Sequence, residues 1–466
     1  MSTDLLETNA PTPAEVQRSA IDRITSWFKR RAVTTADEDL AGGVVRAWLR
    51  ELEACAREQG GPVASRARAV GLIDLYAAMN SATRREALVA FAARLKPDPE
   101  RVEQAFATYR AALGSPDEWA AENGLRAALG SPRANVIRQF GAAPAGARFL
   151  VDLRVEVLEW QREAPELQVL EAELEAQLAT WFDVGFLELR RIGWESPAHI
   201  LEKLMTYEAV HEISSWADMK NRLDHDRRVY AFFHPRLKDE PLVFVEVALT
   251  EDIAGNIGLL LDQKARVFDP RRARAAMFYS ISSTQPGLRG ISFGNFLLKR
   301  VVEDLRRDFP KLLHFATLSP MPGFAAWLAA TPDVPAALRE ALSKPEWPED
   351  AALAAAMRAP LMSLAAEYLL KAKQGRDGGG VPRDPVARFH LGNGARAERL
   401  NWLADRSDKG LAQSHGLMVN YYYDLDEIES NVSAFDAQGV VAAGPRMTRL
   451  ARIGERMRAE AAVRTG

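Results

Sequence analysis

The feature that most restricts the fold is helical periodicity from residue 12 to about residue 185, with almost no strand signal. Apolar residues fall on one face of the first such segment: Val16, Ala20, Ile24, Trp27 and Phe28. Alanine is abundant in the segments that follow, as in residues 111–130. The pattern predicts an all-helical N-terminal domain over residues 1–186.

Strand signals dominate the chain after about residue 190. Residues 228–236 and 241–249 are rich in β-branched and aromatic side chains and flank a polar turn, which predicts a hairpin. Residues 275–283 form another strand, 290–309 a helix whose apolar positions face inward, and 312–318 a returning strand. This order of strand, turn, helix and strand is a βαβ unit.

The rest of the second half alternates between helical and loop composition. It reads as an alanine-rich helical insertion at about 323–372, a glycine-rich loop at 374–385, a helix at 395–405, a strand within 417–425 and a terminal helix at 446–463. We therefore expect an α+β protein, mainly α overall, whose second domain over residues 187–466 contains a mixed β-sheet.

Composition excludes several classes of protein. A net charge of -3 gives no reason to expect a nucleic-acid or anionic-membrane partner. The single cysteine, Cys55, rules out an intrachain disulfide and lies at helical spacing from Trp48, as a core residue would. No run of about 18 apolar residues predicts a membrane helix, and Asp4 and Glu7 are unlike a targeting peptide, so the expected location is cytoplasmic.

The first candidate site is the turn at 288–295, between a strand and a long helix. Unpaired N–H groups at a helix N-terminus form an anion site, and Gly290 and Gly294 would let a pyrophosphate approach the backbone. These glycines are equally compatible with an ordinary turn.

Two further candidates are Ser319 and His390. Ser319 follows a predicted strand, where its hydroxyl could reach a ligand, although a serine before proline also commonly starts a turn. His390 lies between an apolar-aromatic stretch and a glycine-rich turn, as a buried general acid or a core histidine would. The spacing of four other histidines does not resemble a metal site, so we interpret them as structural or surface residues: His199, His211, His225 and His314.

The 288–295 turn resembles the acyl-CoA loop of the GCN5-related N-acetyltransferases. Arg289, Gly294 and the pair Leu297-Leu298 match that loop, whereas Ser292 replaces its middle glycine, as in a divergent branch. Longer stretches closely resemble the malonyl-CoA decarboxylase family in order: residues 193–223, 227–250, 277–305, 315–328, 389–395 and 416–425. By this resemblance, residues 187–430 are identified as part of a member of that family.

The resemblance implies an N-terminal helical domain used in oligomer contacts, in a homotetramer, and a catalytic domain with the acetyltransferase-like fold. It implies conversion of malonyl-CoA to acetyl-CoA and carbon dioxide without metal or organic cofactor, within malonate or fatty acid metabolism. Ser319 would be the proton acceptor that hydrogen-bonds the malonyl group. His390 would be the proton donor, acting as imidazolium or through a relay, so that activity falls as pH rises through its pKa.

The resemblance also implies substrate-binding residues. The CoA pyrophosphate would lie against the turn made by Arg289, Gly290, Ile291, Ser292, Phe293, Gly294 and Asn295, and Ser280 would line the malonyl pocket. Animal relatives carry a glutamate where this chain has Ser292, so the role of that acid does not carry over. The alternatives are a CoA-dependent N-acyltransferase, a non-catalytic CoA-thioester-binding protein and a Ser–His thioesterase.

Overall fold

The computed structural model describes residues 37–291, 296–374 and 380–465. The expected helix within 12–31 lies outside this part of the chain. The described residues form two compact units, which are treated separately: one contains residues up to Asp183 together with 285–292, and the other contains 184–284 and the residues after 292. Inclusion of 285–292 in the first unit is a feature that the sequence does not reveal.

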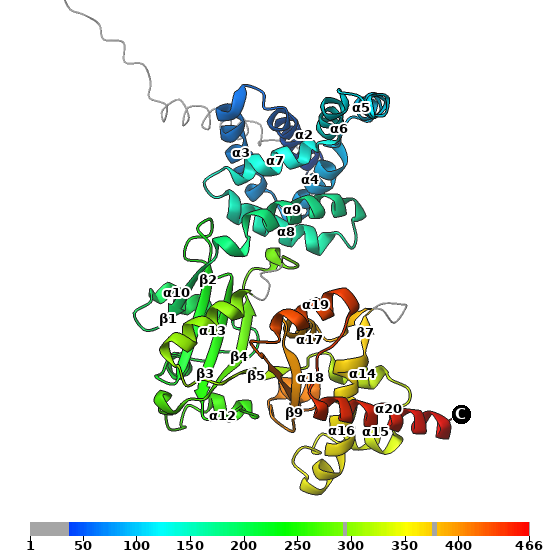
Figure 1. Cartoon of the computed structure of the whole chain (residues 1–466). Coiled ribbons are helices and arrows are strands. Elements are labelled where there is room, and N and C mark those ends of the chain that lie inside the picture. Colours follow the sequence, from blue (N-terminus) through cyan, green and yellow to red (C-terminus); the bar gives the residue numbers. More distant parts are fainter. Residues whose placement is uncertain (1–36, 292–295, 375–379, 466) are drawn as a thin grey trace, which may run out of the picture. The chain divides into compact units, whose positions relative to one another are not determined.

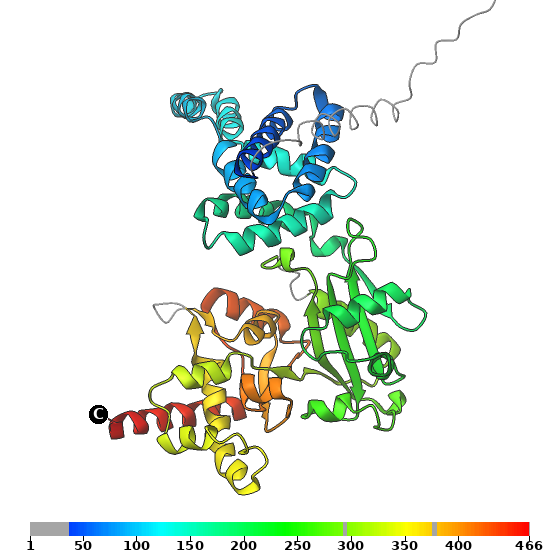
Figure 2. The same ribbon diagram turned by 180° about the vertical axis from the view of Figure 1, so that it is seen from behind.

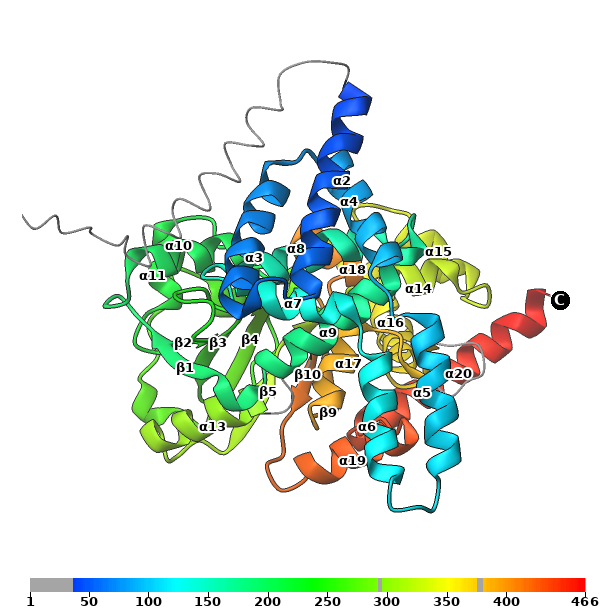
Figure 3. The same ribbon diagram turned by 90° about the horizontal axis from the view of Figure 1, so that it is seen from above.

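The first unit consists of helices, which confirms the predicted helical region (Figure 1). They are α2 (Asp37–Ala56), α3 (Gly61–Ala78), α4 (Ser81–Arg94), α5 (Pro99–Ala112), α6 (Glu118–Leu129), α7 (Pro132–Gly141), α8 (Gly146–Trp160), η1 (Pro165–Leu167) and α9 (Gln168–Trp181). The α5–α6 pair forms an antiparallel hairpin (Figure 3). Aromatic side chains fill the core, with the rings of Trp48 and Phe91 6.0 Å apart.

Cys55 lies in this core, as predicted. Its side chain is fully buried, and its Sγ lies 3.7 Å from the carbonyl oxygen of Ser65. Burial raises the pKa of the thiol to about 11, so it stays protonated and unreactive at neutral pH.

The second unit is built on a mixed β-sheet in the order β1-β2-β3-β4-β5-β10-β6, with β9 paired to β10. The strands are β1 (Glu188–Ile192), β2 (Arg227–Phe233), β3 (Val243–Thr250), β4 (Ala275–Ser283), β5 (His314–Thr317), β6 (Ser319–Pro320), β9 (Arg396–Asn401) and β10 (Met418–Tyr422). The β2–β3 hairpin is confirmed, and so is the βαβ unit, in which α13 (Phe296–Asp308) joins the parallel strands β4 and β5.

Helices cover both faces of this sheet. On one face, the Tyr230 hydroxyl of β2 donates to Asp304 of α13, and Val301 and Leu305 are fully buried. On the other face, α10 (Ala198–Tyr207) packs Leu201 and its apolar neighbours against alternate residues of β2 (Figures 1 and 2). Alternation of side chains across β2 therefore supplies both contacts. The short helices α11 (Trp216–Arg222) and α12 (Ile257–Leu261) complete this part.

The predicted helical insertion is present as α14 (Phe324–Ala330), α15 (Ala336–Leu342) and α16 (Ala351–Lys371). By length and apolarity α16 could cross a membrane, but 67% of its apolar window is buried inside the protein, as in a core helix. It packs against α20 (Pro445–Thr465), the predicted terminal helix. In the expected loop 374–385, Lys373–Gln374 (β7) pairs with Val381–Pro382 (β8), and α17 (Pro385–Gly392) follows at once.

One expected helix is wrong. Residues 395–405 contain good helix formers, yet Arg396–Asn401 form β9 and pair antiparallel with β10. Ala397 and Leu400 are buried in that pairing. Contacts with a distant strand thus override the local helical preference. The remaining helices are α18 (Asp408–Ser414) and α19 (Ile428–Gln438).

Candidate active site

Ser319 lies where the central strands of the sheet separate. Strands β4 and β5 are paired as far as Phe278 and Thr317. The chain then continues into β6, where Ser319 pairs with Val419 of β10 instead. The Ser319 side chain is buried, with 5% of the residue exposed, so its hydroxyl needs partners inside the protein.

His390 is placed by the start of its own helix. Asp384 caps α17 by accepting hydrogen bonds from the backbone N–H groups of Val386 and Ala387, each at 2.9 Å. Asp384 also accepts from the Tyr368 hydroxyl at 3.1 Å and from the N–H of Gly323 at 3.4 Å. Since Gly323 lies just beyond Ser319 in the chain, this one carboxylate ties α17 to the segment that carries the serine.

The structure brings Ser319 and His390 together, although 71 positions separate them in the chain. Nε2 of His390 lies 3.1 Å from Oγ of Ser319, and Nδ1 lies 2.8 Å from the hydroxyl of Tyr423. On its other side, Oγ of Ser319 lies 2.8 Å from Oγ1 of Thr317. The four side chains form one continuous row of hydrogen bonds, which we call the catalytic row. The ring of Tyr421 stacks on the imidazole at a centroid distance of 4.7 Å.

The hydrogen bonds of the catalytic row assign the imidazole proton. Thr317 Oγ1 accepts a hydrogen bond from the backbone N–H of Tyr421 at 3.1 Å and another from the Ser319 hydroxyl. With its proton directed at Thr317, Ser319 offers a lone pair to His390, which therefore carries its proton on Nε2. Nδ1 then accepts from Tyr423.

No member of the catalytic row is charged near neutral pH. Burial lowers the pKa of His390 from 6.5 to about 3, so the imidazole is neutral. Burial also raises the pKa of Tyr423 well above 10, so the phenol keeps its proton. A standing imidazolium, one of the two forms expected from the sequence, is therefore disfavoured in the substrate-free protein, and the relay is favoured.

Thr317 and Tyr423 are site residues that the sequence reasoning missed. Both lie within stretches that carry the family resemblance, residues 315–328 and 416–425. A threonine two positions before the serine shares its side of an extended strand, which is a signal that could have identified Thr317. The pairing of Tyr423 with His390 depends on how β10 and α17 meet and has no local signal.

Ser280 has a different set of partners. Its hydroxyl lies 2.8 Å from each carboxylate oxygen of Glu208, and Ser282 donates to the same carboxylate at 3.2 Å. Glu208 also borders a hollow of about 940 Å³ that His211, Asp405 and Lys409 help to line. The role of Ser280 in a malonyl pocket stays a prediction.

The predicted CoA turn is described only in part. Arg289 and Gly290 are exposed, and Gly290 adopts a φ of 86°, a conformation that favours glycine. Ile291 is partly exposed. Ser292, Phe293, Gly294 and Asn295 lie outside the described residues, so the binding of pyrophosphate at this turn stays a prediction.

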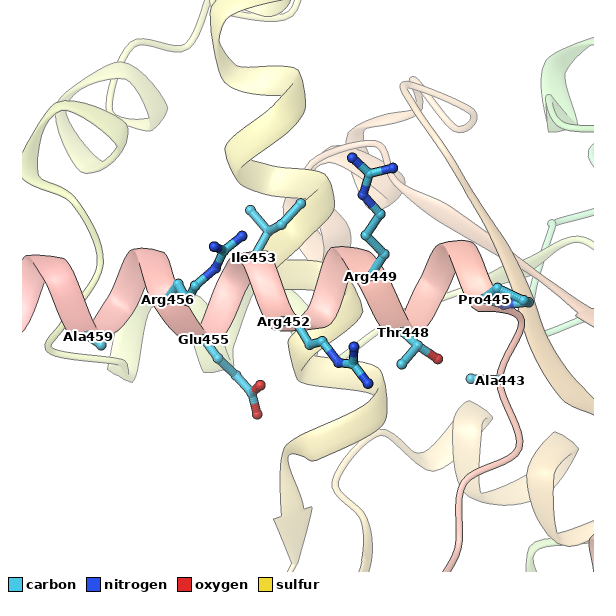
Figure 4. A pocket seen from close by; sticks show the side chains of 9 residues that line it. All are labelled: Ala443, Pro445, Thr448, Arg449, Arg452, Ile453, Glu455, Arg456 and Ala459. Carbon is cyan, nitrogen blue, oxygen red and sulfur yellow. The ribbon is translucent and has the colours of Figure 1, made fainter.

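A separate groove follows the outer face of α20. Thr448, Arg449, Arg452 and Arg456 line it, and their side chains project from successive turns of this one helix (Figure 4). Ser319 and His390 are not among its lining residues. The groove is a basic helix surface distinct from the catalytic row.

Comparison with known proteins identifies the family. The profile of the malonyl-CoA decarboxylase C-terminal domain matches residues 185–462, and that of the N-terminal domain matches residues 95–182. The chain belongs to the malonyl-CoA decarboxylase family. The predicted family is thus confirmed, and with it an enzyme of the carboxy-lyase class rather than a non-catalytic protein.

Relatives and solved structures of the malonyl-CoA decarboxylase family agree over most of the chain. The mitochondrial malonyl-CoA decarboxylase of Rattus norvegicus is 40% identical over 344 residues, which cover 67% of this chain and 69% of the relative. That of Anser anser anser is 35% identical over 418 residues, covering 81% and 82%. The crystal structure of malonyl-CoA decarboxylase from Rhodopseudomonas palustris superposes with a TM-score of 0.81 at 42% identity, covering 87% of this chain and 99% of that one.

The expected cytoplasmic location is wrong. The curated malonyl-CoA decarboxylases that match this chain, from Rattus norvegicus, Mus musculus and Anser anser anser, are named as mitochondrial proteins. The expectation rested on the residues of the first segment, and composition near a chain end is weaker evidence than a relative identified over two thirds of the chain.

Proposed function

We propose that this chain converts malonyl-CoA to acetyl-CoA and carbon dioxide at the catalytic row of Thr317, Ser319, His390 and Tyr423. The observation that carries the proposal is the 3.1 Å contact between Ser319 Oγ and His390 Nε2, buried and neutral, in a member of the malonyl-CoA decarboxylase family. Loss of carbon dioxide requires a hydrogen-bond donor for the developing oxyanion and an acid for the α-carbon.

The first step breaks the bond between the α-carbon and the carboxylate. Carbon dioxide leaves, and the electron pair moves onto the α-carbon and the thioester oxygen as an enolate. The Ser319 hydroxyl, turned from Thr317 toward the substrate, donates to the malonyl group in this step. Since the thioester itself accepts the electron pair, the chemistry needs no metal ion and no organic cofactor, and the CoA moiety is part of the substrate.

The second step moves a proton to the α-carbon. The Nε2 proton of His390 is transferred to the enolate carbon as Nδ1 takes the phenolic proton of Tyr423. An enolate carbon is a stronger base than a phenolate, so the transfer is favourable. Solvent returns one proton to Tyr423 after the product leaves, and each turnover consumes one proton.

The test is mass spectrometry of purified protein incubated with malonyl-CoA alone. We expect acetyl-CoA and carbon dioxide, with a rate that falls about 10²- to 10⁴-fold in Ser319→Ala and in His390→Gln. His415→Asn is the control: His415 is a partly buried histidine whose pKa is also lowered by desolvation, to about 4, and its φ of 51° is one that asparagine tolerates.

Each other outcome contradicts the proposal in a different way. Free CoA as the main product would indicate a thioesterase, and unchanged malonyl-CoA that reacts only when an amine is added would indicate an N-acyltransferase. Full activity in both variants would remove the catalytic row from the mechanism.

Two finer expectations are part of the same proposal. The CoA pyrophosphate would bind beside the turn that begins with Arg289 and Gly290. The enzyme would also assemble as a homotetramer through its helical unit. Sedimentation equilibrium of the full chain tests the second expectation, because a monomer at micromolar concentration would contradict it.

A further inference from the structure

The segment that leads into the CoA turn is packed against helices of the first unit. After β4 the chain forms a short 3₁₀ helix, η4 (Pro286–Leu288), that lies against α8 (Figure 1). Gly287 sits so close to α8 that an added Cβ would lie 1.9 Å from the carbonyl oxygen of Val151. Nη1 of Arg148, also on α8, donates to the Gln285 side chain at 2.6 Å. By its contacts this segment belongs to the helical unit.

Arg154 is the centre of this packing. Its side chain is 2% exposed, and its Nη1 donates to the carbonyl oxygens of Gly287 at 2.9 Å and of Arg289 at 2.7 Å. Its Nε and Nη2 both donate to Glu171 of α9, at 3.2 Å and 2.7 Å. The carboxylate balances the buried charge, and the guanidinium fork reaches the carbonyls at fixed angles.

These contacts set the direction of an amide group. A trans peptide carries its C=O and its N–H on opposite sides. Because the carbonyl of Arg289 points at Arg154, the N–H of Gly290 in the same peptide points away from it. Gly290 is exposed and adopts a φ of 86°, so the N–H that turns away from Arg154 belongs to an exposed residue.

We propose that Arg154 is a positioning residue for CoA: it holds the Arg289–Gly290 peptide so that the Gly290 amide faces the pyrophosphate. The inference rests on the proposed binding of CoA at this turn, and it requires no contact between Arg154 and the substrate.

A matched pair of arginines makes the test specific. Arg133 is also buried in the helical unit, donates to two carbonyl oxygens, those of Ala92 and Leu95, and pairs with a carboxylate of α9, Glu173. Its partners are all outside the turn. Arg154→Met and Arg133→Met therefore remove similar sets of bonds, apart from a second carboxylate, Glu175, that lies 3.4 Å from Nη2 of Arg154. Only the bonds of Arg154 reach the turn.

The measurements are calorimetric binding of CoA and decarboxylation kinetics with malonyl-CoA and with malonyl-N-acetylcysteamine, a thioester without a pyrophosphate. In Arg154→Met we expect the Kd for CoA and the KM for malonyl-CoA to rise about tenfold, the effect of losing a charge-assisted hydrogen bond. The kcat, and the kcat/KM for the short thioester, should stay within about twofold. Arg133→Met should leave all of these values unchanged, although both variants lose stability.

Arg154→Lys is a second variant, for use if Arg154→Met does not fold. It keeps the positive charge beside Glu171 and a hydrogen-bond donor for the carbonyl oxygens of Gly287 and Arg289. Its Kd for CoA should rise about threefold, between wild type and Arg154→Met. A folded Arg154 variant that binds CoA as wild type does, or that loses activity equally with both thioesters, would overturn the inference. Wild type that binds CoA without decarboxylating malonyl-CoA would instead contradict the proposed function and leave this inference standing.

Discussion

Two buried polar regions of the sheet unit differ in charge. The catalytic row of Thr317, Ser319, His390 and Tyr423 consists of neutral groups, each of which can both donate and accept a hydrogen bond. The second region surrounds Arg222 of α11 and is built from charged groups.

The guanidinium of Arg222 donates hydrogen bonds through all three of its nitrogens. Nη1 donates to Glu246 of β3 at 2.9 Å, Nε to Asp218 at 3.0 Å and Nη2 to the carbonyl oxygen of Glu212 at 3.1 Å. Burial raises the pKa of Glu246 to about 7, but the guanidinium of Arg222 can only donate hydrogen bonds. This arrangement therefore holds α11 on the sheet and cannot reverse the direction of its hydrogen bonds. A row that relays a proton needs groups that can switch between donating and accepting a hydrogen bond. Burial alone therefore does not distinguish a polar region that relays protons from one that only stabilises the fold.

The largest expected effect on stability comes from the charged region. Arg222→Met should lower the free energy of unfolding by about 3–5 kcal/mol, because it leaves Glu246 buried without its cation. Urea unfolding followed by circular dichroism measures the change. Arg272→Met, which breaks an exposed pair with Glu251, is the control and should cost less than about 1 kcal/mol.

Adding Glu246→Leu to Arg222→Met sharpens this test. With both members of the pair removed, no uncompensated charge remains on β3, and part of the lost stability should return. A loss below about 1 kcal/mol in Arg222→Met itself would mean that the region is not a structural ion pair.

Individual elements of the fold also differ in how well the sequence predicts them. Strand β4 was predicted with its observed bounds, Ala275–Ser283, because its β-branched and aromatic residues continue to a clear turn. Strand β9 was mistaken for a helix, because its residues favour a helix and only β10 makes them a strand. Local pattern thus locates elements whose own residues decide their structure.

The residues of the catalytic row also differ in how far the sequence could indicate them. Ser319 and His390 were candidates from their local sequence, but only the family resemblance placed them in one site, since nothing in their spacing shows that they meet. The two-residue spacing of Thr317 and Ser319 on an extended strand could have indicated Thr317. Tyr423, in contrast, completes the row through the way in which the end of β10 meets α17, which no local pattern reports. The role of Arg154 was likewise invisible, because the residues it holds follow it by more than a hundred positions.

A smaller effect is expected where one hydrogen bond of the row is removed. Tyr423→Phe should lower kcat about tenfold with little change in KM, because Nδ1 of His390 loses both its hydrogen-bond donor and its proton source. Steady-state kinetics with malonyl-CoA measures the change. Tyr422→Phe is the matched control at the neighbouring position, since the Tyr422 hydroxyl lies 3.2 Å from Nδ1 of His314 instead. Equal kcat values for the two variants would exclude Tyr423 from the relay.

The smallest expected effect is that of pH on the rate. Because burial lowers the pKa of His390 to about 3, the imidazole does not titrate between pH 6 and 8, and kcat/KM should change less than about twofold there. This replaces the fall in activity near neutral pH that an exposed catalytic histidine would give. A tenfold loss per pH unit through 6.5 would show that imidazolium is the acid and would remove Tyr423 as the proton source.

The lowered pKa of His390 should affect the free energy of unfolding at acid pH, although it leaves kcat/KM nearly constant between pH 6 and 8. Below pH 6.5 the unfolded chain protonates this histidine while the folded protein does not, so the free energy of unfolding falls as pH drops from 6.5 toward 3. His390→Gln should make the free energy of unfolding depend less on pH in this range. His415→Asn should do the same, because the pKa of His415 is lowered to about 4. Only His390→Gln should also lower the turnover rate by about 10²- to 10⁴-fold. Comparison of the two variants therefore separates the contribution of a neutral histidine to catalysis from its effect on the free energy of unfolding at acid pH.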